Sequence, residues 1–545
     1  MTRCARPAGP LARLALMSAL ALSPLLLSNT GPGVARAQSA PPASVLPSLG
    51  DGAELSVAAE RRLGDSFARD IYRDPDYLDD PVLGDYLMAV WQPLLGAART
   101  RGDVPPELAE RLAWELMISR DKRVNAFALP GGYLGVNLGL LAVTDTPQEL
   151  ASVLAHELSH VSQRHIARMI ARQDRGAPWL MGAMILALLA ARANTEVASA
   201  AMVGGQAVAA QTQLKFSRDM EREADRVGFG VLSGAGFDPT GFVTMFDKLQ
   251  QAARHNDDGA FPYLRSHPLT SERIADMQAR LPLVSSGPRV GPLAGSPVAT
   301  AGSALPTLGG LALRPEAVAP PVTTAWHVLM SARARVLAEN SPDRWRAWLQ
   351  HGLRAGATPA DLYAAALSAH RLRQHDQGLA LAQRLASQAG ADTRWAADAL
   401  WMELWLAPGA SQPPLADRAV ALRDAALASG QRSGLLLGAQ VAQATGALAP
   451  ATQRLNDWVL THPRDAQAWQ VLAQLHQAQG QRLRALRAEG EARAAQLDFG
   501  SAAEHFKAAQ ALPAADRAAD PMELAIVDAR RREVEAQARD ALRED

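Results

Sequence analysis

Two histidines four residues apart, with a glutamate directly after the first, stand in the stretch TPQELASVLAHELSHVSQRH, residues 146–165. Side chains four residues apart lie on the same face of a helix, so His156 and His160 can reach one metal ion. Glu157 can then face a water on that ion rather than the ion itself. This H-E-x-x-H spacing predicts a hydrolytic zinc site, in which the ion activates water and the glutamate moves its proton.

The residues before the motif predict the helix that must hold it. Thr146 is a suitable N-cap, Pro147 suits the first helical position, and Glu149 stands three residues after the cap. We therefore expect a helix that begins at Pro147. The alternative is a surface helix with two solvated histidines. The flanking residues are mostly apolar, however, and a largely buried helix does not carry two histidines without partners.

Two histidines leave a tetrahedral zinc site short of a protein ligand. The compact pattern H-E-x-x-H-x-x-G-x-x-H is broken after its second histidine, so the missing ligand must come from farther along the chain. The predicted helix from Ser217 to Leu232 is the best source, because Glu221 and Asp225 lie four apart on one face, whereas Glu223 points elsewhere. We expect Glu221 to ligate and Asp225 to orient a ligand imidazole. The alternative is a solvated charged face.

The N-terminal residues 1–37 have the pattern of a signal peptide. Basic residues precede an apolar run over residues 14–27, and an A-x-A site ends at Ala37. The alternative is a membrane anchor, which needs about 20 apolar residues. We expect export with cleavage after about Ala37. Cys4 is the only cysteine and leaves with the signal, which excludes a disulfide or a thiol nucleophile in the mature chain.

Composition and length give the class of protein and its division. Lysine plus arginine total 55 and aspartate plus glutamate total 55, so we expect no nucleic-acid partner. At roughly 150 residues per domain, 545 residues predict two to four domains. We expect a first domain over residues 51–281, a linker over 282–324 rich in proline, glycine and alanine, and a helical domain over 325–545.

In the first domain, apolar residues at every third or fourth position predict helices over 53–120 and again over 147–281. Between them, a Pro-Gly-Gly turn separates two predicted short strands, Val124 to Ala128 and Tyr133 to Val136. The segment from Ala177 to Ala193 has an uncharged core too short to span a bilayer. A core helix, a membrane-surface segment and a flap over the cleft are the alternatives. We expect a cleft cover that touches membrane or substrate.

The C-terminal part contains an internal repeat. Three residue pairs recur at 34-residue spacing: Leu435 and Trp469, Ala439 and Ala473, Ala451 and Ala485. The stretch WQVLAQLH, from Trp469 to His476, fits the opening of a tetratricopeptide repeat, and Pro463 falls where a repeat would end. The alternative is a generic alanine-rich helical bundle. We expect an all-α solenoid whose concave face binds protein.

H-E-x-x-H followed about sixty residues later by E-x-x-x-D, with NAFALPGG upstream, resembles the M48 family of zinc metallopeptidases. The resemblance implies a mostly helical, α+β domain of the zincin (gluzincin) type with a small sheet. It implies one zinc ion per chain, held by His156, His160 and Glu221. It also implies that Glu157 is catalytic and that Asp225 is a supporting carboxylate.

The same resemblance implies two further features of the site. The family's sheet edge corresponds to NAFALPGGYLGV, so a substrate strand would pair with Asn125, Ala126, Phe127 and Ala128. The alternative is a core hairpin. A loop histidine of the family keeps zinc's open position closed, and this role would fall to His267. The alternative is a helix-entry histidine with a local hydrogen bond.

With an export signal before the domain and repeats after it, the whole chain resembles periplasmic members of the family that act on outer-membrane β-barrel precursors. We therefore expect a periplasmic zinc endopeptidase that degrades failed precursors or assists their assembly. Its repeats would recruit the barrel assembly machinery, with membrane-surface contact in addition. One alternative is a repeat-based chaperone or scaffold with a latent or structural zinc site. The other is a broad-specificity protease that ignores barrels.

Overall fold

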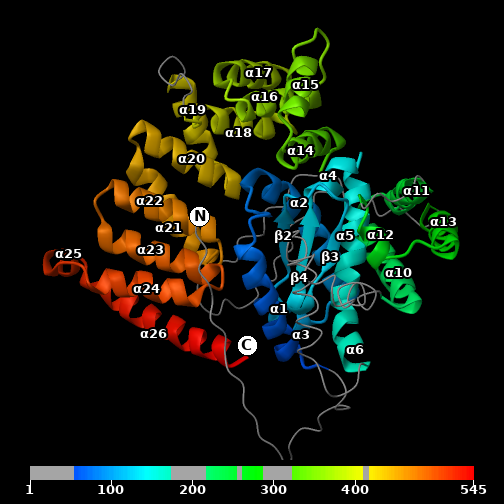
Figure 1. Ribbon diagram of the computed structural model, residues 1–545, viewed down its shortest axis with the longest axis horizontal. Helices are drawn as coiled ribbons and strands as arrows, with labels where there is room; N and C mark the ends of the chain where they lie inside the picture. Colours follow the sequence, from blue (N-terminus) through cyan, green and yellow to red (C-terminus); the bar gives the residue numbers. More distant parts are fainter. Residues whose placement is uncertain (1–54, 173–215, 255–259, 286–321, 409–415, 545) are drawn as a thin grey trace, which may run out of the picture. The chain divides into compact units, whose positions relative to one another are not determined.

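A small sheet with helices around it forms the part of the chain that carries the motif (Figure 1). The computed structural model describes residues 55–172, 216–254, 260–285, 322–408 and 416–544, all within one structural unit, Ala53–Asp545. The predicted signal peptide, the apolar segment Ala177–Ala193 and most of the predicted linker lie outside the described residues. Helices prevail and the sheet is small, which confirms the predicted α+β class with a helical C-terminal part.

The sheet has the strand order β1-β2-β4-β3, so β3 is an edge strand. Strand β2 pairs with β4 in parallel, with Ile118 opposite Val136, and β3 pairs with β4 antiparallel, with Phe127 opposite Gly135. The elements up to this point are α1 (Val57–Arg73), β1 (Tyr77–Leu78), α2 (Pro81–Arg101), α3 (Pro106–Arg111), β2 (Glu115–Ser119), β3 (Ala126–Ala128), the 3-10 turn η1 (Pro130–Gly132), β4 (Tyr133–Asn137) and α4 (Leu138–Val143).

Two predictions in this region are wrong. The helix predicted over 53–120 does not include residues 115–119, which form β2. Helix α3 ends at Arg111 and the backbone of Leu112 is already extended, and pairing of residues 115–119 with β4 overrides their local helix propensity. The predicted strand from Val124 starts instead at Ala126, because the backbone of Val124 bonds outside the sheet, to Ala260 and Tyr263.

Helix α5 carries the motif and begins at Pro147, as the sequence predicts. The hydroxyl of Thr146 accepts a hydrogen bond from the backbone N–H of Glu149 at 3.3 Å. In Figure 1 the helix runs alongside the sheet, next to β3. The remaining helices of this part are α5 (Pro147–Ser162), α6 (His165–Arg172), α10 (Arg218–Gly234), α11 (Thr240–Arg254), α12 (Tyr263–Ser266) and α13 (Ser271–Ser285).

The C-terminal part is a succession of helices, several of them in consecutive hairpins. Helix α22 begins 34 residues after α20, and α23 begins 34 residues after α21, which matches the predicted repeat length. The helices are α14 (Thr324–Leu337), α15 (Pro342–Gly352), α16 (Pro359–Arg371), α17 (His375–Gln388), α18 (Arg394–Trp405), α19 (Ala416–Ala428), α20 (Arg432–Thr445), α21 (Leu448–Thr461), α22 (Ala466–Ala478), α23 (Arg482–Ala495), α24 (Phe499–Gln510), α25 (Ala514–Ala518) and α26 (Pro521–Glu544).

One buried ion pair and two half-buried ones join the C-terminal helices to the start of α2 and to one another. The guanidinium of Arg333 on α14 donates to Asp80, the N-cap of α2, and to Glu403 on α18. Arg432 on α20 donates to Asp79, next to that cap, and to Asp465.

Among the described helices, none is both long and apolar enough to cross a bilayer.

Candidate metal centre

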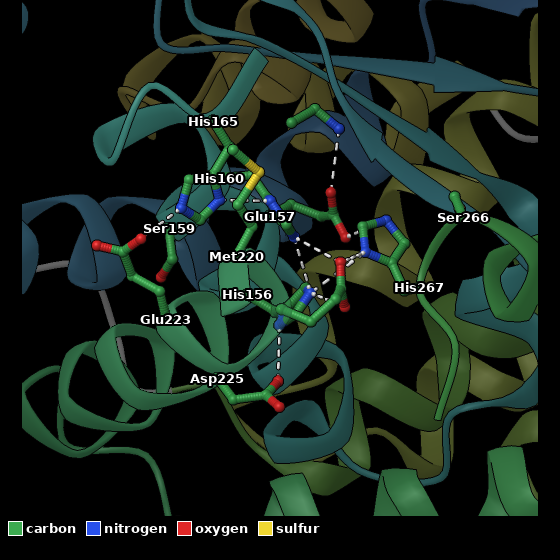
Figure 2. Close-up of polar contacts among 12 residues, drawn as sticks. His156, Glu157, Ser159, His160, His165, Met220, Glu223, Asp225, Ser266 and His267 are labelled. Carbon is green, nitrogen blue, oxygen red and sulfur yellow. Dashed lines mark hydrogen bonds and ion pairs between the residues drawn. The ribbon is translucent and has the colours of Figure 1, made fainter. Parts of the chain in front are cut away.

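Four buried side chains from three segments of the chain meet at one point (Figure 2). His156 and His160 come from α5, Glu221 comes from the first turn of α10, and His267 is the residue that ends α12. One ligand atom from each residue lies within 4.8 Å of the ligand atoms of the others. None of the four residues is more than 2% exposed.

The distances between these atoms suit a tetrahedral ion. Nε2 of His156 lies 3.0 Å from Nε2 of His160 and 3.5 Å from Oε2 of Glu221. Nδ1 of His267 lies 3.3 Å from Nε2 of His156 and 3.0 Å from Oε1 of Glu221. A tetrahedral zinc ion with bonds of about 2.1 Å holds neighbouring ligand atoms about 3.4 Å apart. Imidazole nitrogens with one carboxylate also form a donor set that zinc prefers, so the cluster fits a zinc site.

Close packing of α5 against α10 brings the motif and Glu221 together. Ser217 caps α10 by accepting a hydrogen bond from the N–H of Met220 at 3.2 Å, which fixes the helix start just before Glu221. Farther along, a Cβ added to Gly228 would lie only 3.0 Å from the carbonyl oxygen of Ala155 on α5. Glycine at this position therefore permits the short distance between the two helices.

Glu157 is fully buried and has one bound and one unbound carboxylate oxygen. Its Oε2 accepts a hydrogen bond from the backbone N–H of Ala128 at 3.0 Å. Its Oε1 accepts none within the described part of the chain and lies 3.5 Å from Nε2 of His267. Buried polar atoms are seldom left without a partner, so this oxygen is available for a group held at the cluster. Burial raises the pKa of Glu157, which suits a proton acceptor.

A second set of charges supports the cluster from outside. Oδ1 of Asp225 lies 3.0 Å from Nδ1 of His156. Both oxygens of this carboxylate accept hydrogen bonds from Arg273, at 2.6 and 2.8 Å. The same guanidinium lies 2.8 Å from Oε2 of Glu221 and donates to the carbonyl of Pro268. Arg273 therefore ties α10 to the loop that carries His267.

The charge around His156 favours a cation. Burial alone lowers the pKa of His156, but hydrogen bonds and attraction from Asp225 and Glu221 outweigh it and raise this pKa to about 9. The pKa of His160 falls well below its usual value, because of burial and because of repulsion from His156. The carboxylates thus create a negative potential at Nε2 of His156, and the same potential attracts a metal ion.

The segment before His267 bonds to Val124, two residues before β3 begins. Val124 donates its N–H to the carbonyl of Ala260 at 2.8 Å and accepts from the N–H of Tyr263 at 3.3 Å. The ring of Tyr263 stacks on that of His267, with 4.7 Å between ring centroids. One segment therefore contacts both the residues that lead into β3 and the metal-binding cluster.

The sequence analysis named all four residues that meet in the cluster, but it missed three residues that contact them. Arg273 carries no motif, and Phe216, whose ring stacks on His160 with 3.9 Å between centroids, precedes the α10 cap without a recognisable signal. His165 lies five residues after His160, which in a continuous helix would direct the two side chains apart.

Comparison with known proteins agrees with this geometry. Residues 100–281 match the family described as peptidase family M48. A putative beta-barrel assembly-enhancing protease of Vibrio cholerae is 35% identical over 237 residues, which are 43% of this chain and 47% of that protein. The beta-barrel assembly-enhancing protease of Escherichia coli K12 is 32% identical over 240 residues, or 44% of this chain and 47% of the relative.

A third relative belongs to another compartment. The mitochondrial metalloendopeptidase OMA1 of Schizosaccharomyces pombe is 33% identical over 171 residues, which are 31% of this chain and 48% of that protein. The chain spans about half the length of the curated relatives it matches. The matched residues include both motif histidines, Glu221 and His267. Residues 100–281 are therefore identified as a peptidase family M48 domain.

Proposed function

We propose that this protein is an exported zinc-dependent endopeptidase that acts in outer-membrane protein assembly. The observation that carries the proposal is the buried cluster of three histidines and one glutamate, with the unbound oxygen of Glu157 beside it. The relatives named beta-barrel assembly-enhancing protease support the setting.

In this proposal His156, His160 and Glu221 hold the ion, and Asp225 orients the ring of His156. Their spacing, close to that of tetrahedral ligand atoms, supports these roles. A bound zinc ion would lower the pKa of a nearby water to about 7 and polarise a peptide carbonyl. Zinc binds neutral imidazoles, and a proton on Nδ1 of His156, 3.0 Å from the carboxylate of Asp225, leaves Nε2 free to face the ion.

Glu157 is the proposed general base. The N–H of Ala128 holds its Oε2, so Oε1 stays directed at the site and can accept a proton from water. The same oxygen can then give the proton to the amine that leaves when the peptide bond breaks. A positioned general base contributes about a hundred- to ten-thousand-fold in rate.

The outer edge of β3 is the proposed substrate strand, from Asn125 to Ala128. Asn125 and Leu129 bond to β4 through their backbones, so the alternating residue Ala126 directs its N–H and carbonyl away from β4. A bound peptide could pair with Ala126 by adding a strand next to β3. The N–H of Ala128, in contrast, is already bonded to Glu157.

His267 is proposed to keep the resting enzyme closed. Its Nδ1 occupies the fourth corner of the cluster, where a catalytic zinc site leaves a position open for water. Because the same loop also bonds to Val124, a substrate strand that advances along β3 would displace the loop and His267 together. Substrate binding would thereby open the site.

The position of His267 as a fourth ligand also favours the second candidate function, a repeat-based chaperone or scaffold. Zinc sites with four protein ligands are usually structural, and His267 supplies a fourth. The two functions differ in whether removing this ring opens an active site. In both, the C-terminal helices recruit partners, and a cavity of about 410 Å³ lined by Leu460, Trp469 and Phe499 supports this role.

The decisive experiment compares zinc content and casein cleavage of wild type, Glu157→Gln and Glu221→Gln. Glu157→Gln should retain zinc and lose cleavage, because Glu157 acts on water and does not ligate. Glu221→Gln should lose both. Zinc-free Glu157→Gln protein, or Glu221→Gln protein with normal zinc and activity, would contradict the proposed roles.

A further inference from the structure

A series of hydrogen-bonded polar side chains, which includes His165 at the start of α6, reaches the metal-binding cluster on the side of His160. His165 is fully buried, and its Nδ1 lies 2.8 Å from Nδ1 of His160. Its Nε2 lies 3.1 Å from Oε2 of Glu223, which also accepts a hydrogen bond from Arg168 at 2.9 Å. Figure 2 shows His165 between the ring of His160 and the carboxylate of Glu223.

The positions of the protons in this series of side chains follow from the two groups at its ends, His160 and Glu223. A ligand imidazole must present an unprotonated nitrogen to the ion, and Nε2 of His160 is the atom that faces the cluster. Nδ1 of His160 then carries the proton and donates it to Nδ1 of His165. His165 consequently carries its own proton on Nε2 and donates it to Glu223. One pair of tautomers satisfies every contact.

An interruption of the helix makes this contact possible. Residues five apart in a continuous helix are rotated by about 140°, so His165 would point away from His160. Helix α5 ends at Ser162, and Arg164 adopts a φ of 52° before α6 begins at His165. A non-glycine residue in the left-handed region is uncommon and is retained where the surrounding structure holds it. Here Arg164 is held by an ion pair with Glu60 at 2.9 Å.

We propose that His165 and Glu223 are positioning residues for the metal ligand His160. The carboxylate–imidazole pair fixes the orientation and tautomer of His160 and strengthens it as a ligand, as Asp225 does for His156. The inference rests on the proposed zinc site and deepens it. Outer partners of metal-bound histidines typically account for a 10- to 100-fold change in metal affinity.

The test measures zinc affinity of the full-length protein by competition with a chromophoric chelator. His165→Leu removes the acceptor for the proton on His160, and we expect zinc to bind about 10- to 100-fold more weakly. His165→Asn keeps an oxygen near the place of Nδ1 and should recover part of the affinity. Glu223→Gln keeps a hydrogen-bond acceptor but removes the charge, so its loss should be smaller than that of His165→Leu.

Asp219→Asn is the matched control, because Asp219 lies on α10 with Glu223 and its side chain is 91% exposed. This variant should bind zinc as wild type does. The visible spectrum of the cobalt-substituted protein should change in His165→Leu and Glu223→Gln but not in the control. Melting of the metal-free proteins separates positioning from stability, since a merely structural residue would lower the Tm without weakening zinc binding.

Each outcome decides the matter. Wild-type zinc affinity and cobalt spectra in both His165→Leu and Glu223→Gln would overturn the proposal. Should His165→Leu fail to fold, Glu223→Gln decides alone, because that side chain is 27% exposed and tolerates the change. A wild-type protein that binds no zinc would reject the proposed function itself, which is a different result from equal binding by all variants.

Discussion

Arg333 gives the most demanding test of how the C-terminal helices attach to the peptidase-like part. Its side chain is 5% exposed and lies between two carboxylates, Asp80 at 2.7 Å and Glu403 at 2.7 Å. It also donates to the hydroxyl of Tyr363 at 3.1 Å. Arg333→Met removes the charge while keeping much of the volume, and it leaves the two carboxylates buried near each other.

The expected cost follows from that geometry. Removing one partner of a buried ion pair destabilises a protein by about 3–5 kcal/mol, because the remaining charge stays desolvated. Arg333→Met combined with Asp80→Asn should recover a large part of this, since the asparagine is uncharged and can still accept the capping hydrogen bond from Leu83. The control is Arg346→Met, whose side chain is 63% exposed and whose change should stay within about 0.5 kcal/mol.

Urea unfolding, followed by circular dichroism and by tryptophan fluorescence, measures the difference. With a slope of about 1–3 kcal/mol per molar urea, a loss of 3–5 kcal/mol lowers the midpoint by more than about 1 M. Where the two signals do not coincide, the first transition is compared. A midpoint for Arg333→Met no lower than that of Arg346→Met would refute the reasoning.

Four further results are expected. His267→Ala should cleave casein and itself faster while it keeps zinc, and lower activity with unchanged zinc would instead make His267 a catalytic group. Gly228→Val should force α5 and α10 apart and weaken zinc binding in the chelator assay, whereas unchanged affinity would show that the close contact is dispensable. Leu460→Glu, at a side chain that is 78% exposed, should reduce copurification with the barrel assembly machinery without changing casein cleavage, and full copurification would argue against the cavity as the docking surface. Burial raises the pKa of Asp465, but the hydrogen bond and the charge of Arg432 outweigh burial, so the net pKa lies below its usual value. Asp465→Asn should therefore reduce the Tm at pH 7, and by progressively less as the pH falls below about 4. An equal loss of Tm at pH 3 would contradict this.

The sequence analysis was accurate for features that depend on residues close together in the chain. The cap at Thr146 fixed the start of α5, and the four-residue spacing placed His156 and His160 side by side, because both depend on helix geometry alone. Glu221 was grouped with them because a tetrahedral zinc site needs another ligand and because Glu221 and Asp225 lie four residues apart on one predicted helix. The functional roles of these residues, and the domain boundaries, stay predictions.

Features that depend on distant contacts were not predictable in this way. Strand β2 has helix-compatible residues and becomes a strand because β4 pairs with it. The interruption at Arg164 has no glycine or proline to announce it, so His165 could not be assigned to the site from its spacing. Arg273 reaches Glu221 and Asp225 from a helix some fifty residues later, and no local pattern encodes such a contact.

The buried charges explain why the cluster suits a divalent ion. Glu157, Glu221 and Asp225 contribute three negative charges in a region that water barely reaches, and Arg273 contributes one positive charge. An isolated buried charge is costly, so such a group of side chains is stable only when the charges nearly cancel. Neutral histidines with a dication bring the sum to zero, whereas a monovalent ion would leave one carboxylate uncompensated. The set of acids that could perform the chemistry is therefore also the set that selects the charge of the ion.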